Sequence, residues 1–170
     1  MKIAITDACI FIDLIDLRLM SEFFGLPLEI HTSLDVYNEL FPDQQELLKA
    51  YQSTGKLFIH NLTQNDRIQI LKEEFPRSLS ENDKSVLFLA SKHDAMIISS
   101  DKAVRNYANT RAIEYHGMLW IFDGLINANL ISKEEAVVKI NNLILTNPFY
   151  KNNMKLVTEI LKRIEKWSLK

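Results

Sequence analysis

Short apolar runs rich in β-branched residues alternate along the chain with longer segments whose apolar residues recur at helical spacing. The runs predict five strands, at Lys2–Thr6, Leu28–Thr32, Leu57–His60, Ala95–Ser99 and 112–116. The fourth run carries no charge, which is expected of a strand covered by helices on both faces. Glycine and proline are scarce, so most of the chain is expected to form regular structure.

The segments between these runs predict helices, because their apolar residues fall on one face and capping residues often precede them. The predicted helices span 9–17, 20–24, 33–41, 42–52, 64–74, 80–93, 101–108, 118–128, 132–145 and 151–167. Regular alternation of strands and helices predicts an α/β fold, with a parallel sheet of about five strands wrapped by helices and right-handed crossovers.

Composition and charge restrict the function classes. The 170 residues are 47% hydrophobic and 25% charged, which is typical of one soluble globular domain. A net charge of -2 excludes a global basic field that attracts nucleic acid. A single cysteine excludes an intrachain disulfide and a cysteine-based zinc site. Charged residues interrupt the apolar amino terminus, so we expect neither a signal peptide nor a membrane span, and a cytoplasmic location.

Two acidic residues lie where parallel sheets bind ligands, at the carboxyl ends of strands. Asp7 ends the first predicted strand, and Asp101 follows the fourth. Glu39 and Asp83 lie beside the apolar faces of two predicted helices. Mg²⁺ and Mn²⁺ prefer oxygen ligands, and several carboxylates that converge without cations would repel one another. The four acids therefore form a candidate metal site.

Each acid also has an ordinary structural interpretation. Asp7 and Asp101 fit helix N-caps, Asp83 fits a capping box with Ser80, and Glu39 fits a solvated helix surface. No single acid identifies a site, and the metal hypothesis depends on the joint pattern.

The joint pattern resembles the PIN-domain family, which includes VapC-like toxin ribonucleases. The segment ITDACIFIDL resembles its opening strand and first acid, here Asp7, and VYNEL resembles the segment with the second acid, here Glu39. The segment LSENDKSVLFLASKHDAMIISSDKAVR places Asp83 on the third acid, Ser99 on a hydroxyl position, and Asp101 on the fourth acid. Where the family usually has asparagine or serine, two residues after the first acid, this chain has Cys9.

This resemblance implies a PIN-like fold over residues 1–170, with a nuclease core at 1–125 and a C-terminal helical extension at 126–170. It implies a Mg²⁺- or Mn²⁺-dependent endoribonuclease, the toxin of a toxin–antitoxin pair. The metal ligands and catalytic residues would be Asp7, Glu39, Asp83 and Asp101, and Ser99 would orient Asp101. The implied partners are RNA, a small antitoxin protein and a second copy of the chain.

Other interpretations stay open at this stage. The neutral charge and Cys9 favour a catalytically degenerate PIN fold that binds nucleic acid or a protein without cleavage. A nuclease of RNA processing or defence is a third hypothesis. The basic residues Lys84, Lys102 and Arg105 contact either phosphates or only solvent. The four histidines show no metal-site spacing and are interpreted as structural or surface residues, at positions 31, 60, 93 and 116.

Overall fold

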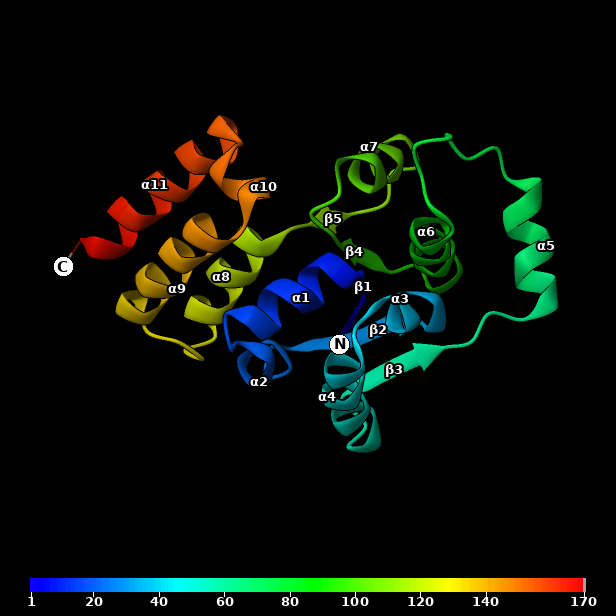
Figure 1. The fold of residues 1–170 in the computed structure, drawn as a ribbon, viewed down its shortest axis with the longest axis horizontal. Helices are drawn as coiled ribbons and strands as arrows, with labels where there is room; N and C mark the ends of the chain where they lie inside the picture. Colours follow the sequence, from blue (N-terminus) through cyan, green and yellow to red (C-terminus); the bar gives the residue numbers. More distant parts are fainter. Residues whose placement is uncertain (170) are drawn as a thin grey trace. The chain divides into compact units, whose positions relative to one another are not determined.

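A five-stranded sheet, in which every pair of neighbours is parallel, organises the chain in a computed structural model that describes residues 1–169 (Figure 1). The strand order is β3-β2-β1-β4-β5. The strands are β1 (Lys2–Thr6), β2 (Leu28–Ser33), β3 (Leu57–His60), β4 (Met96–Ile98) and β5 (Tyr115–His116). This architecture confirms the predicted α/β class.

Helices connect the strands and continue the chain beyond β5. They are α1 (Ala8–Asp16), α2 (Met20–Phe23), α3 (Leu34–Glu39), α4 (Pro42–Ser53), α5 (Gln64–Lys72), α6 (Glu81–His93), α7 (Lys102–Thr110), α8 (Met118–Asn127), α9 (Lys133–Thr146), α10 (Pro148–Lys151) and α11 (Met154–Ser168). The short helix α10 was not predicted, because its four residues are too few to show a periodic pattern. The strands β4 and β5 are shorter than predicted.

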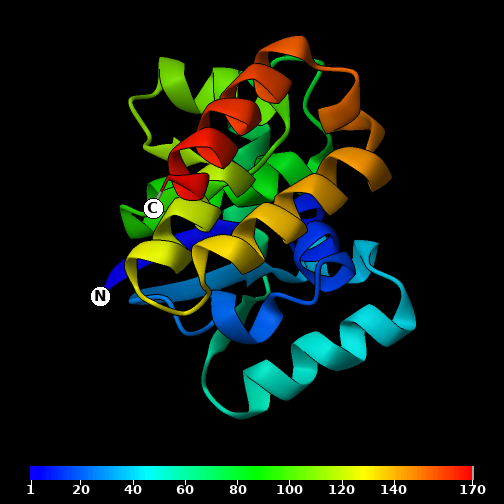
Figure 2. The same ribbon diagram turned by 90° about the vertical axis from the view of Figure 1, so that its left-hand side faces the viewer.

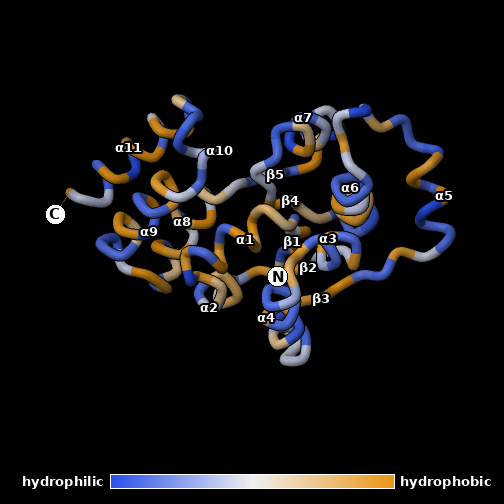
Figure 3. Tube along the Cα trace, viewed as in Figure 1, coloured by the Kyte–Doolittle hydropathy of each residue, from blue (hydrophilic) through white to orange (hydrophobic). Residues whose placement is uncertain are grey.

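The chain forms two compact units. The first contains residues 1–12 and 27–118, and the second contains residues 13–26 together with 119 onward. The first unit holds the whole sheet, and α6 packs against β1, β2 and β4. The central strands consist mainly of hydrophobic residues, whereas hydrophobic and hydrophilic residues alternate along the helices (Figure 3). The residues of β4 are all buried, as their lack of charge predicts.

The second unit is helical. Its helices α9 and α11 lie side by side (Figure 2). Asp13 is a buried acid, with only 5% of its surface exposed. The side-chain amide of Asn147 donates to Asp13 Oδ1 at 2.8 Å, and the Tyr150 hydroxyl donates to Oδ2 at 3.3 Å. Burial raises the pKa of Asp13 to about 6 although these two hydrogen bonds lower it.

Three of the four histidines gather at β2, β3 and the end of α6, although they are far apart in sequence. His31 Nδ1 lies 2.7 Å from His60 Nε2, and the ring centroids of His60 and His93 are 4.8 Å apart. Burial and the neighbouring His31, His93 and Lys92 lower the pKa of His60 to about 4. His60 is therefore neutral at pH 7, and its ring stacks on the ring of His31.

Candidate functional site

The pairing of β1 with β4 brings two of the predicted site residues to the same edge of the sheet. Thr6 pairs with Ile98 in register, and the Asp7 N–H donates to the Ile98 carbonyl at 3.2 Å. Asp7 follows the end of β1 directly, and Ser99 follows the end of β4. The sheet order reverses at this pair, since the chain runs from β1 to β2 on one side and reaches β4 later on the other. Ligands of parallel sheets bind at such a reversal.

Asp7 is buried, with 6% of its surface exposed. Its Oδ2 accepts a hydrogen bond from the Ser99 hydroxyl, and its Oδ1 accepts from the Cys9 thiol at 2.7 Å. The Ile10 N–H also approaches Oδ1, at 3.4 Å. Burial raises the pKa of Asp7 to about 6; the hydrogen bonds from Cys9 and Ser99 oppose this rise, and the charge of Asp83 adds to it.

Ser99 connects the two acids at the strand ends. Its hydroxyl donates to the Asp7 carboxylate and accepts from the Asp101 N–H at 3.1 Å. The family resemblance implied that Ser99 orients Asp101. In the structure its contact with Asp101 is through the backbone, and its side-chain contact is with Asp7. Ser99 is completely buried, so this geometry is protected from water.

Cys9 occupies the position where the family usually has a polar residue. The structure places it half-buried, with its thiol directed at Asp7 Oδ1 and the Ser100 N–H 3.4 Å from its sulfur. The thiol of Cys9 is therefore a weak hydrogen-bond donor at the position where the family usually has the side chain of asparagine or serine.

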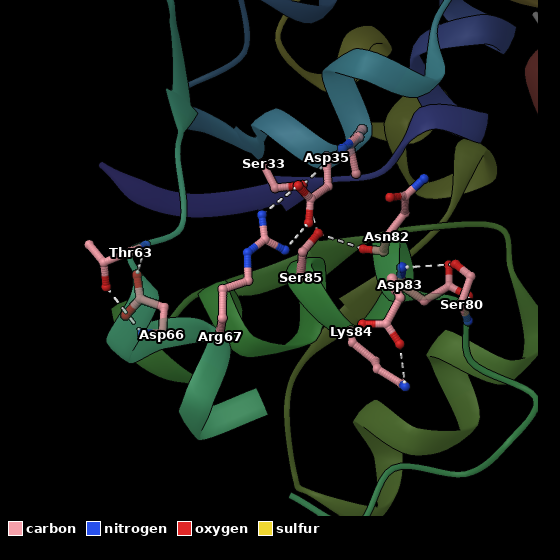
Figure 4. Close-up of polar contacts among 12 residues, drawn as sticks. Ser33, Asp35, Thr63, Asp66, Arg67, Ser80, Asn82, Asp83, Lys84 and Ser85 are labelled. Atoms are coloured by element: carbon pink, nitrogen blue, oxygen red, sulfur yellow. Dashed lines mark hydrogen bonds and ion pairs between the residues drawn. The ribbon is translucent and has the colours of Figure 1, made fainter. Parts of the chain in front are cut away.

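Asp83 and Asp101 both cap the starts of helices, as their ordinary interpretations predicted. The Ser80 N–H donates to Asp83 Oδ2 at 2.8 Å, and the Asp83 N–H donates to the Ser80 hydroxyl at 3.1 Å, which forms a capping box (Figure 4). Asp101 Oδ1 accepts from the Val104 N–H at 3.0 Å. Within residues 1–169, the second oxygen of each carboxylate takes no part in these capping hydrogen bonds.

Glu39 is the last residue of α3 and is exposed. The side-chain amide of Asn82, in the first turn of α6, donates to Glu39 Oε2 at 2.9 Å. Asn82 was not predicted from the sequence. The only available signal was an amide next to a candidate acid at a helix start, and that signal is too common to be specific.

Side-chain hydrogen bonds join the helices that carry these residues. The Ser33 and Ser85 hydroxyl oxygens lie 2.7 Å apart, and the Ser85 hydroxyl donates to the Asn82 carbonyl at 2.6 Å. The guanidinium of Arg67 forms a two-pronged ion pair with Asp35, with N–O distances of 2.6 and 2.8 Å (Figure 4). Because α3 is tied to α5 and α6, Glu39 and Asp83 are held in a fixed relation.

The four predicted acids line one pocket of about 120 Å³. The other residues of its lining are Ala8, Cys9, Val36 and Asn82. No lysine or arginine belongs to this lining, and none of the four carboxylates forms an ion pair within the part of the chain that is described. The donor set is therefore all oxygen apart from one thiol, which fits a hard divalent ion in its chemistry.

The oxygens are not arranged as a ready coordination shell. Among residues 1–169, no group of three or more His, Cys, Asp or Glu side chains has its donor atoms placed to hold a metal ion. Each of the four carboxylates is instead engaged in a hydrogen bond with Ser99, Ser80, Val104 or Asn82. Metal binding in this pocket would require small rotations of these side chains.

The three candidate phosphate contacts differ in availability. Lys84 Nζ pairs with Glu81 Oε1 at 2.7 Å. The guanidinium of Arg105 lies 5.2 Å from the centre of the Tyr115 ring. Lys102 is exposed and forms no ion pair among residues 1–169. Lys102 is thus the most accessible of the three for a polyanion.

The chain is similar to a known protein family over almost its whole length. A family model described as a PIN domain matches residues 3–166. The chain belongs to the PIN-domain family. PIN domains have a nuclease-type fold, generally bind RNA and typically use divalent metal ions. The resemblance drawn from the sequence is therefore confirmed.

Two solved structures are similar to this PIN domain. One is a PilT N-terminus domain protein from the hyperthermophilic archaeon Sulfolobus solfataricus P2, with 13% identity, a TM-score of 0.48, and coverage of 74% of this chain and 92% of the other. The other is a domain of a functionally unknown protein from Methanocaldococcus jannaschii DSM 2661, with 17% identity, a TM-score of 0.49, and coverage of 69% and 91%. No curated protein matches the PIN domain described here. Among its described residues, no helix is long and apolar enough to cross a membrane.

Proposed function

We propose that this PIN domain is an endoribonuclease that hydrolyses RNA phosphodiester bonds with Mg²⁺ or Mn²⁺. Asp7, Asp83 and Asp101 would hold the ion, and Glu39 would contribute directly or through water. The observation that carries the proposal is the convergence of four carboxylates on a pocket whose described lining contains no cationic side chain. Such a concentration of negative charge favours a bound divalent cation.

The residues of the pocket have distinct parts in this proposal. When bound, a divalent ion supplies a more acidic water for in-line attack on phosphorus and neutralises charge on the phosphodiester. Ser99 and Cys9 hold the Asp7 carboxylate, so that its direction is fixed by packing. Asp101 is held by its helix cap, with its second oxygen left for the ligand. Lys102, next to Asp101, would contact an RNA phosphate.

Manganese titration by calorimetry, paired with an RNA cleavage assay, tests the proposal. The parent protein is expected to bind Mn²⁺ and to cleave single-stranded RNA, and Asp101→Asn is expected to weaken both. Asp43→Asn is the matched control, because Asp43 is an exposed acid in the first turn of α4 outside the pocket lining. Cleavage that persists unchanged in Asp101→Asn, or a parent protein that binds no Mn²⁺, would contradict the proposal.

Asn82 is expected to act as a positioning residue for Glu39. The change Asn82→Ala removes the 2.9 Å hydrogen bond to Oε2 and is expected to lower the cleavage rate by about tenfold, as is common for partners of metal ligands. The Mn²⁺ concentration for half-maximal activity should rise in parallel, while the melting temperature stays unchanged. Loss of activity that instead follows a fall in melting temperature would assign Asn82 a purely structural role.

A second function is supported by specific observations. The carboxylates are engaged in hydrogen bonds rather than arranged as a coordination shell, and a thiol occupies the usual asparagine or serine position. Both features favour a PIN fold that binds nucleic acid or a protein without cleavage. The same calorimetric titration separates the two functions, since a degenerate pocket should bind no Mn²⁺.

The biological role that we propose is that of a cytoplasmic toxin that acts as a homodimer and is restrained by a small antitoxin protein. This role is supported by the resemblance to VapC-like toxins. Expression of the chain should then arrest growth, and a small co-encoded protein should restore it. Nuclease activity without growth arrest would favour a role in RNA processing or defence.

A further inference from the structure

A second, larger hollow adjoins the acidic pocket in the first unit. It has a volume of about 740 Å³ and lies between α7 and the segment that joins α5 to α6. Asp101 belongs to the lining of both hollows, so both border the start of α7. Hollows of this size hold small ligands and nucleotides in other proteins. Its position next to the acids makes it a candidate for the part of a substrate beside the cleaved bond.

We call this larger hollow the groove. Its lining is suited to an uncharged ring. Pro76, Ala103 and Tyr107 provide apolar surface, and Asn106 provides an exposed carboxamide. The charged residues of the lining are the acids Glu74 and Asp101 and the base Lys102, so the lining has no excess positive charge that would select phosphate. A nucleobase combines apolar faces with a polar edge, and the amide of asparagine matches such an edge with one donor and one acceptor side by side.

The wall of the groove is fixed by hydrogen bonds before any ligand binds. Glu73 Oε1 accepts from the Tyr107 hydroxyl at 2.5 Å and from Arg111 Nη2 at 2.6 Å. Arg111 Nε also donates to the Tyr107 hydroxyl at 3.1 Å, and the rings of Phe75 and Tyr107 have centroids 5.0 Å apart. These contacts anchor the joining segment on α7. A preformed groove loses little entropy when it binds a ligand.

We propose that this groove seats the base of the RNA nucleotide next to the cleaved phosphodiester and that Asn106 contacts the edge of that base. The inference rests on the proposed ribonuclease function and adds to it the residue that contacts the flanking base. Lys102 lines this groove and follows Asp101, the residue that borders both hollows, and it contacts the phosphate that joins the seated nucleotide to the acidic pocket. The occupant is single-stranded RNA, because a base within a duplex cannot present its edge to the groove.

Binding of short labelled single-stranded RNA, measured by fluorescence anisotropy in EDTA at low salt, tests the groove without cleavage. Asn106→Leu replaces the amide with an apolar side chain of similar size, and it is expected to raise the dissociation constant about tenfold, the order of loss seen when a base contact is removed. Asn109→Leu is the matched control, since Asn109 is exposed on the same helix outside the groove lining. Its dissociation constant should stay within about twofold of the parent value.

Asn106→Ala provides a second variant that removes only the polar contact, and it should weaken binding by a smaller factor. Equal affinities for the Asn106→Leu and Asn109→Leu variants, or a parent protein that does not bind the RNA saturably, would overturn the inference. The two proposals can fail separately. Asn106-dependent binding without any Mn²⁺-dependent cleavage keeps the groove and removes the hydrolytic role. Asp101-dependent cleavage with unchanged binding in Asn106→Leu does the reverse.

Discussion

Replacement of Asp7 by asparagine is expected to lower the rate of RNA cleavage by about two to three orders of magnitude. The substitution keeps the size of the side chain but removes the charge that would face a divalent ion. Asp7 is buried and contacts Ser99 and Cys9, so we expect asparagine to occupy the same position without supplying the charge. The measurement is the initial rate of Mn²⁺-dependent cleavage under single-turnover conditions.

The same variant should be more stable than the parent protein when metal is chelated. At pH 8 the parent must keep an ionised carboxylate in a buried site, and burial raises its pKa to about 6 from the usual 3.8. Removal of that charge is expected to increase the free energy of unfolding by about 2–3 kcal/mol. Loss of activity with a gain in stability indicates a functional acid. Full activity in Asp7→Asn would contradict the assignment.

Replacement of Asp13 by asparagine is expected to stabilise the protein without affecting cleavage. The isosteric amide can still accept from Asn147 and can donate to the Tyr150 hydroxyl, but it carries no buried charge. In the folded protein the pKa of Asp13 is raised to about 6, whereas in the unfolded chain it is near 3.8. The folded state therefore binds more protons between these pH values, and the contribution of Asp13 to stability falls as the pH rises through this window.

Urea unfolding from pH 4 to pH 8 measures this effect. The difference in unfolding free energy between Asp13→Asn and the parent should be near zero at about pH 4 and should grow to about 2–3 kcal/mol above pH 7. Asp13 does not line the acidic pocket, so this variant also serves as the buried-acid control for Asp7→Asn in the cleavage assay. A difference in stability that does not change with pH would show that the pKa of Asp13 is the same in the folded and unfolded states.

The hydrophobic pattern predicted most of the fold, because strands and long helices leave periodic signals. The strands β1 and β3 have the predicted bounds, and Ser80 caps α6 as expected. The hydrophobic pattern did not predict the tertiary contacts that join residues distant in the sequence. The burial of Asp13 depends on Asn147 and Tyr150, and the histidine cluster depends on the pairing of β2 with β3. Neither contact has a local signature.

The candidate site could be predicted from the sequence in part. Asp7 and Asp101 follow strands that become neighbours, so the position of each at a strand end was sufficient to predict a common edge. Which partners fix these acids could not be predicted, since Ser99 bonds Asp7 across 92 positions of the chain and Asn82 bonds Glu39 across 43. The groove along α7 also depends on a loop position that periodicity does not determine.

The double use of Asp83 and Asp101 as helix caps has a consequence for ligand binding. A carboxylate on a free side chain loses rotational freedom when it grips an ion, and that loss weakens affinity. Here the hydrogen bonds to Ser80 and Val104 have already restricted both side chains during folding. Part of this entropic cost is therefore met when α6 and α7 form, so the two capped carboxylates have less rotational freedom left to lose when they turn toward an ion. Loosening either helix start should then weaken ion binding from a distance.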